Sequence, residues 1–170
     1  MAISKIGGTA SDNWELISSV TPTAASAAVN FTGLTSYRKL LLMWDGLVLA
    51  ATGSVSVRLN NDSGSNYAYT NAEYNSGGVD KYSNNFSIFA TEIGFSISGT
   101  NPEGMVEIHN CDTTGLKNIV NGANGGVVSG TRNLNRFFGY YKASAIVTQV
   151  NLITSSTFNA SGTVYLYGVK

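Results

Sequence analysis

The segment from Gly162 to Val169 constrains the fold more than any other part of this sequence, because its side chains alternate with a period of two residues. Such alternation places Val164 and Leu166 on one face of a β-strand. Tyr165 and Tyr167 then lie on the other face, so apolar bulk is present on both sides. We therefore expect a central strand that closes a β-sandwich, because a strand of this kind needs partners already in place.

Short apolar or alternating runs, separated by clusters of turn residues, fill the rest of the chain, and no segment has a convincing helical period. This pattern is typical of an antiparallel sandwich or barrel. The expected strands are Trp14–Ser19, Ala27–Phe31, Lys39–Leu49, Ser54–Leu59, Tyr67–Ala72, Phe86–Ile97 with a break near Thr91, Gly104–Asn110, Leu116–Asn121, Arg136–Tyr141, Ala145–Ile153 and Gly162–Val169. The predicted fold class is all-β, an antiparallel, jelly-roll-like β-sandwich of two packed four-stranded sheets with no significant helix.

The length of 170 residues fits a single domain with a sizeable core. Residues 1–13 are expected to form an N-terminal arm, and residues 14–170 a single β-sandwich domain. The candidate residues for attachment of this arm to a neighbouring molecule are Ile3, Lys5 and Ile6.

Three internal segments carry further expectations. The apolar run from Leu40 to Leu49 is too short and interrupted for a bilayer, and it predicts a strand buried on both faces. The Gly-rich segments Ala72–Asn85 and Gly122–Thr131 are long, polar and without periodicity, so both are predicted to be loops.

Charged residues make up only 12% of the chain, against roughly 25% in an ordinary globular protein. The ten basic and ten acidic side chains cancel, which argues against binding of nucleic acid. Zero net charge also favours close packing against other copies or another assembly. The first residues lack the apolar core of a signal peptide and no run could span a membrane, so we expect synthesis in a host cytoplasm and no membrane partner. The single cysteine, Cys111, is expected to be a small buried or loop thiol.

Four blocks of the sequence resemble small surface proteins of tailed-phage virions. They comprise Trp14 with Phe31-Thr32-Gly33-Leu34 and the strand at Leu40; Arg58-Leu59-Asn60, Asp62-Ser63-Gly64 and Asn66-Tyr67-Ala68-Tyr69; Val106-Glu107-Ile108-His109-Asn110 with Lys117-Asn118-Ile119; and Gly162–Val169. The resemblance implies a jelly-roll-like module, usually trimeric, on a capsid or a tail.

The segment Asn60–Asn66 has two interpretations. An Asp-x-Gly turn joins two predicted strands, with asparagine side chains capping backbone groups and Gly64 free to adopt positive φ. The alternative is a calcium loop, because Asn60, Asp62 and Asn66 offer oxygen ligands. We favour the turn, because the segment has one carboxylate and no closing glutamate.

Enzymatic activity and a cofactor are not expected from this sequence. Alternation places His109 beside Glu107 on one strand face, opposite Val106 and Ile108, which favours a solvated pair or an interface contact over a catalytic or ligand-binding role. Zinc would need a further ligand, and no Gly-x-Ser-x-Gly motif supplies a nucleophile for Ser-His-Asp chemistry. Paired carboxylates for glycoside cleavage are likewise not apparent.

Aromatic and amide side chains are interleaved between residues 67 and 85. Tyrosine rings stack on sugars while asparagine amides bind hydroxyl groups, so this segment is a candidate glycan site. We favour packing or contact with a neighbouring subunit, because aromatic residues are enriched at protein interfaces. The candidates are Tyr67, Tyr69, Tyr74, Asn75, Tyr82, Asn84 and Asn85.

Two functions remain open at this point. The first is a non-enzymatic capsid decoration or cement protein on the virion surface, a homotrimer that binds the major capsid protein and stabilises the shell. The second is a receptor-binding module of a tail fibre or spike that recognises host surface glycans.

Overall fold

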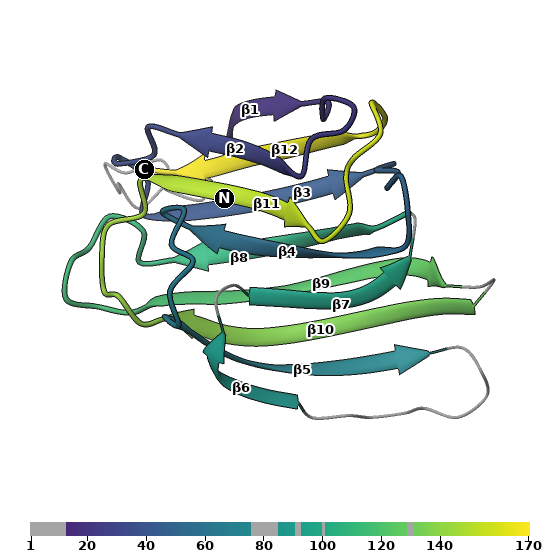
Figure 1. The fold of residues 1–170 in the computed structure, drawn as a ribbon. Helices are drawn as coiled ribbons and strands as arrows, with labels where there is room; N and C mark the ends of the chain where they lie inside the picture. The colour runs from purple at the N-terminus through teal and green to yellow at the C-terminus, as the bar shows by residue number, and fades with distance from the viewer. Residues whose placement is uncertain (1–12, 76–84, 91–92, 100, 129–130) are drawn as a thin grey trace, which may run out of the picture.

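The computed structural model describes residues 13–75, 85–90, 93–99, 101–128 and 131–170, and within them it contains twelve strands and no helix (Figure 1). The strands are β1 (Glu15–Val20), β2 (Ala28–Thr32), β3 (Lys39–Asp45), β4 (Gly53–Leu59), β5 (Tyr67–Asn75), β6 (Asn85–Ala90), β7 (Ile93–Gly99), β8 (Glu103–His109), β9 (Asn118–Val128), β10 (Thr131–Tyr141), β11 (Gln149–Thr154) and β12 (Thr163–Val169).

The strands form two antiparallel sheets that pack face to face, with the smaller sheet in front of the larger in Figure 1. The larger sheet has eight strands in the order β1-β12-β3-β8-β9-β10-β5-β6, and the smaller has four in the order β2-β11-β4-β7. The all-β, jelly-roll-like sandwich is thus confirmed. The prediction of two four-stranded sheets is wrong, because β5, β6, β9 and β10 all extend the larger sheet.

The predicted closing strand is β12, and its central position is confirmed, since it pairs with β1 on one edge and with β3 on the other. Leu166 lies opposite Leu42, and Leu42 lies opposite Val106, so one apolar row crosses three strands of the inner face. These side chains are fully buried against Val57 and Leu152 of the smaller sheet, in one continuous core. The alternation in the sequence therefore indicates which face of the larger sheet is covered by the smaller sheet.

Strand β3 corrects one expectation about burial. Leu40, Leu42 and Trp44 are buried, whereas Leu41 is half-buried and Met43 is exposed. The prediction of a strand buried on both faces is wrong, because only the inner face of the larger sheet is covered by the smaller sheet. Apolar residues on the outer face therefore remain accessible.

The β9–β10 hairpin corrects a second expectation. The predicted loop Gly122–Thr131 is wrong for most of its length, because β9 continues to Val128 and pairs with β10 without interruption. A Cβ atom at Gly122 would lie 2.3 Å from both Phe137 Cζ and the Met105 carbonyl oxygen. This glycine therefore makes room for a buried aromatic ring within a strand and does not form a turn.

The other predicted loop, Ala72–Asn85, begins as strand, because β5 continues to Asn75. Residues 76–84 lie outside the described part of the chain, as do residues 1–12 of the predicted arm.

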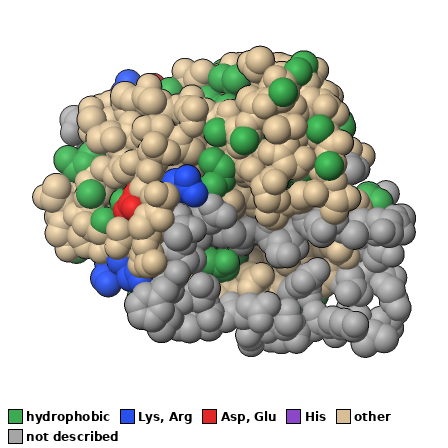
Figure 2. Space-filling view, in the orientation of Figure 1, with side chains coloured by type: hydrophobic (Ala, Val, Ile, Leu, Met, Phe, Trp, Pro, Cys, Tyr) green, Lys and Arg blue, Asp and Glu red, His purple; other side chains and the backbone are tan. Residues whose placement is uncertain are grey.

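Charged side chains are sparse on the face that Figure 2 presents, where most of the visible surface is backbone or uncharged polar side chains. This agrees with the low charged content of the sequence. Across the described ranges, no helix long and apolar enough to cross a membrane is found.

Candidate functional site

The outer face of the eight-stranded sheet gathers exposed apolar side chains. Among the described residues, all exposed large hydrophobic side chains except Trp14 and Leu116 lie on it. We call this surface the apolar face, and its members are Leu16, Met43, Met105, Ile119, Val127, Leu134 and Phe138. Single exposed hydrophobic residues are ordinary, whereas several on one sheet face form a candidate interaction surface.

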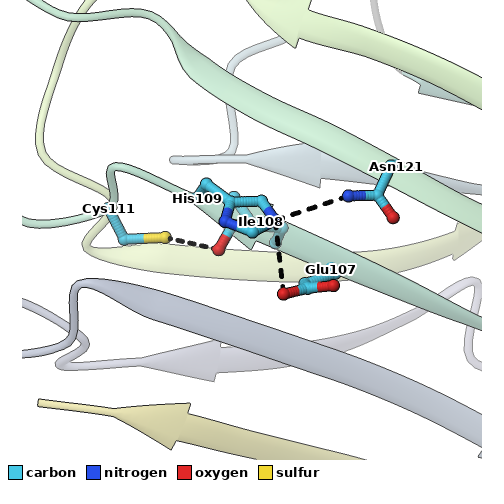
Figure 3. Close-up of polar contacts among 5 residues, drawn as sticks. All are labelled: Glu107, Ile108, His109, Cys111 and Asn121. Carbon is cyan, nitrogen blue, oxygen red and sulfur yellow. Dashed lines mark hydrogen bonds and ion pairs between the residues drawn. The ribbon is translucent and has the colours of Figure 1, made fainter. Parts of the chain in front are cut away.

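A polar cluster lies within the same face, on β8 and β9 (Figure 3). His109 Nε2 lies 3.2 Å from Glu107 Oε1 on the same strand and 3.4 Å from Asn121 Nδ2 on the neighbouring strand. The predicted position of His109 beside Glu107, opposite Val106 and Ile108, is confirmed. Sequence reasoning did not identify Asn121, because its proximity depends on the pairing of β8 with β9.

The two contacts of His109 Nε2 depend on its protonation. A protonated Nε2 donates a hydrogen bond to Glu107, whereas an unprotonated Nε2 accepts one from the Asn121 amide. The same nitrogen cannot do both, so the tautomer of the ring decides how the Asn121 side chain is held.

A depression of about 320 Å³ adjoins this cluster. Its lining residues are Met105, Asn121, Gly122, Ala123, Arg136 and Phe137. Phe138 lies opposite Asn121 across β9 and β10, and its side chain is 58% exposed. The surface therefore combines an amide, a guanidinium and an aromatic ring around a shallow hollow.

The candidate calcium ligands form a hydrogen-bonded turn. Asp62 Oδ1 accepts a hydrogen bond from the Gly64 backbone amide at 2.7 Å. Asp62 Oδ2 accepts from Asn66 Nδ2 at 2.8 Å and from the Tyr141 hydroxyl at 2.7 Å. The hydrogen bond from Tyr141 holds the pKa of Asp62 below its ordinary value, with smaller contributions from Asn66 and Gly64. These contacts agree with the interpretation as a turn.

Asn60 serves a different contact. Its Oδ1 accepts from the Thr148 backbone amide at 2.7 Å, and its Nδ2 donates to the Ile146 carbonyl at 2.9 Å. The side chain thus ties the end of β4 to the segment before β11. Within the described ranges, no group of three or more His, Cys, Asp or Glu side chains could hold a metal ion.

The predicted tyrosine candidates separate in the structure. Tyr67 is fully buried, and its hydroxyl accepts from the Leu59 amide at 2.9 Å and contacts the Leu59 and Asp62 carbonyls. Its burial excludes a glycan or interface contact and agrees with the favoured interpretation of this residue as packing. Tyr69 is partly buried against the core, and Tyr74 is half-buried on β5.

The remaining candidates are placed only in part. Asn75 is the last residue of β5, and Asn85 is the first residue of β6. Tyr82, Asn84 and the arm residues Ile3, Lys5 and Ile6 lie outside the described residues.

Cys111 is confirmed as a buried thiol. Its Sγ donates to the Ile108 carbonyl at 3.3 Å (Figure 3), and burial raises its pKa to about 12. A thiol of this kind is not a reactive nucleophile at neutral pH.

Comparisons with known proteins assign the chain to no family: no protein-family model and no curated protein matches it. Among solved structures it is similar to CG-16, a homodimeric agglutinin from chicken liver, with 13% identity, a TM-score of 0.34, and 80% of this chain and 98% of that chain covered. The galectin LEC-6 of Caenorhabditis elegans is 13% identical, with a TM-score of 0.32 and coverage of 89% and 95%. A Scytalido-glutamic peptidase bound to a peptide-based transition state analog is 9% identical, with a TM-score of 0.30 and coverage of 94% and 66%.

Proposed function

We propose that this chain is a non-enzymatic structural protein of a phage particle, a decoration or cement protein that binds the shell as a homotrimer. The observation that carries the proposal is the apolar face of the eight-stranded sheet. The resemblance of the four sequence blocks to virion surface proteins supports the location and the trimer.

The energetics of docking follow from the composition of this face. Covering apolar surface contributes roughly 25 cal/mol per Å². The apolar face exposes residues such as Met43, Met105 and Leu134, but it also carries Glu107, His109 and Arg136, so a partner must pair these polar groups as well as cover the apolar ones. A trimer would repeat the same contact three times, and the resulting avidity would hold it on the shell without any chemistry.

The double variant Met43→Ser, Leu134→Ser should lose at least about tenfold in affinity for purified particles, because it removes two exposed apolar side chains from the surface. The measurement is the number of bound copies per particle after sedimentation, counted by quantitative mass spectrometry against the major shell protein.

The matched control is Leu116→Ser. Leu116 is 53% exposed, comparable to Leu134 at 44%, but it lies in the β8–β9 connection outside the apolar face. Equal occupancy for the double variant and the control would contradict docking through this face. Wild-type occupancy of only a few tens of copies would place the protein on the tail.

The second candidate function is a receptor-binding module that recognises host glycans, and the polar cluster with its depression favours it. Asn121, Arg136 and Glu107 offer the planar donors and acceptors that hold sugar hydroxyl groups. The exposed ring of Phe138 offers a face for stacking on a pyranose. This site lies on the sheet, whereas the sequence favoured residues between 67 and 85.

Asn121→Ala should weaken glycan binding by at least about tenfold if the cluster is a sugar site, because it removes an amide that faces the depression. Binding is measured on a glycan array and then by calorimetry with any glycan that is retained. Asn159→Ala is the control, since Asn159 is exposed in the loop before β12. Equal affinity of wild type and Asn121→Ala for a glycan would show that the cluster is not the glycan site.

A further inference from the structure

The inner face of the larger sheet changes from apolar to amide side chains where β9, β10 and β5 lie side by side. Under β2, β11 and β4 the inner face carries residues such as Leu42 and Val106. Further along the sheet the buried or half-buried side chains include four asparagines, which are Asn71, Asn124, Asn133 and Asn135. We call this group the asparagine layer.

Strand pairing brings the layer together. Asn124 lies directly opposite Asn135 in the β9–β10 register, and Asn133 is two residues from Asn135 on the same strand face. Asn71 on β5 lies opposite Phe137, one step diagonal to Asn135. Strand β7 packs against β9, β10 and β5, and Figure 1 shows it crossing in front of β9 and β10. The asparagine layer therefore lies in the seam between the two sheets.

Three members of this layer, Asn71, Asn124 and Asn133, have buried polar atoms with no hydrogen-bond partner among the described residues. Asn124 is 1% exposed, and within the described part of the chain neither its Oδ1 nor its Nδ2 has a hydrogen-bond partner. The Oδ1 atoms of Asn71 and Asn133 are shielded from solvent in the same way. Leaving a buried amide unsatisfied costs free energy comparable to a lost hydrogen bond, and three such side chains in one seam would multiply that cost.

We infer that the seam beneath β7 is an internal hydration site in which ordered water molecules bridge Asn71, Asn124 and Asn133. A buried water molecule requires two to four polar partners, and the register supplies donors and acceptors from three adjacent strands. The ring of Trp44 closes the layer toward the apolar core, since its Cζ2 and Asn124 Cβ would each lie 2.6 Å from a Cβ placed on Gly104. The water is therefore confined to the β7 side of the sandwich.

The first test is NMR on the full chain, which measures cross-relaxation between water and the Asn124 side-chain amide protons. A bound water gives a cross-peak whose sign distinguishes a long-lived internal water from a rapidly exchanging surface water. Its absence at Asn124, while the amide resonance is observed, would overturn the inference.

The second test is the variant Asn124→Leu. If water bridges the layer, the substitution removes a partner from the remaining amides and should lower Tm by about 3 to 6 °C. If the amide is simply unsatisfied, replacing it with an apolar side chain should leave Tm unchanged or raise it, which would contradict the inference. Asn159→Leu in the exposed loop is the control and should shift Tm by no more than about 2 °C. If Asn124→Leu does not fold, the NMR test on the wild type decides the question.

Discussion

Substitution of Gly162 by alanine should lower the free energy of unfolding by about 4 kcal/mol. Gly162 adopts φ +74°, a conformation that an L side chain adopts at a cost of about 1 to 2 kcal/mol. A Cβ atom would also lie 2.4 Å from the carbonyl carbon and oxygen of Gly46 and 2.5 Å from the Leu47 amide nitrogen. These are backbone atoms, so relief requires the turn after β3 to move away from the turn before β12.

Urea denaturation of wild type, Gly162→Ala and Gly115→Ala measures this effect. Gly115 adopts φ +84° but has no atom within 4 Å of its added Cβ, so its variant should lose only about 1 to 2 kcal/mol. The difference between the two variants isolates the clash of the two turns. Equal losses in the free energy of unfolding for the two variants would show that the two turns can move apart without an energetic cost.

The second large effect is expected for Asp62→Ala, which should lower the free energy of unfolding by about 3 kcal/mol. The substitution removes the acceptor for the Gly64 amide, the Asn66 amide and the Tyr141 hydroxyl together. Tyr141 is buried against the Tyr67 ring, with centroids 5.0 Å apart, so its hydroxyl would lose its acceptor inside the fold. Burial and the hydrogen bond to Asp62 both raise the pKa of Tyr141, which keeps it a donor at neutral pH.

The contribution of Asp62 should also depend on pH. Its folded-state pKa is lowered, so the stabilisation is complete above the ordinary carboxyl pKa of about 4 and is lost as pH falls through the lower folded-state value. Denaturation curves at pH 7 and pH 3 for wild type and Asp62→Ala measure this dependence. The difference in free energy of unfolding between the two proteins should be smaller at pH 3 than at pH 7. The control is Asp112→Ala, since Asp112 is exposed and its Oδ1 accepts a hydrogen bond from the neighbouring Thr113 hydroxyl. A difference in free energy of unfolding that does not change with pH would contradict the role of the ionised carboxylate.

Local alternation predicted most of the strands because it depends only on neighbours in sequence. The strand from Gly162 and the pairing of His109 with Glu107 on one face both follow from period two. The sizes of the two sheets could not be predicted in this way, because they depend on which distant strands pair. Apolar residues on both faces of β3 predict burial on both faces, yet Met43 is exposed on the outer face.

Glycine content was the least reliable predictor of loops in this sequence. The cluster from Gly122 to Gly126 has the composition of a loop, but Gly122 lies beneath the Phe137 ring inside a long strand. Composition cannot distinguish a glycine that turns the chain from one that admits a neighbouring ring. The polar cluster was missed for a related reason, since Asn121 reaches His109 only through the β8–β9 register.

All members of the apolar face except Leu16, on the edge strand β1, lie on β3, β8, β9 or β10, and each of these four strands pairs with two neighbours. Backbone groups in these strands have already lost their conformational freedom in the free protein. Association through this face therefore incurs little additional ordering entropy, unlike recognition by a segment that folds on binding. The heat capacity change of association should accordingly be negative and scale with the apolar area covered, without a contribution from coupled folding.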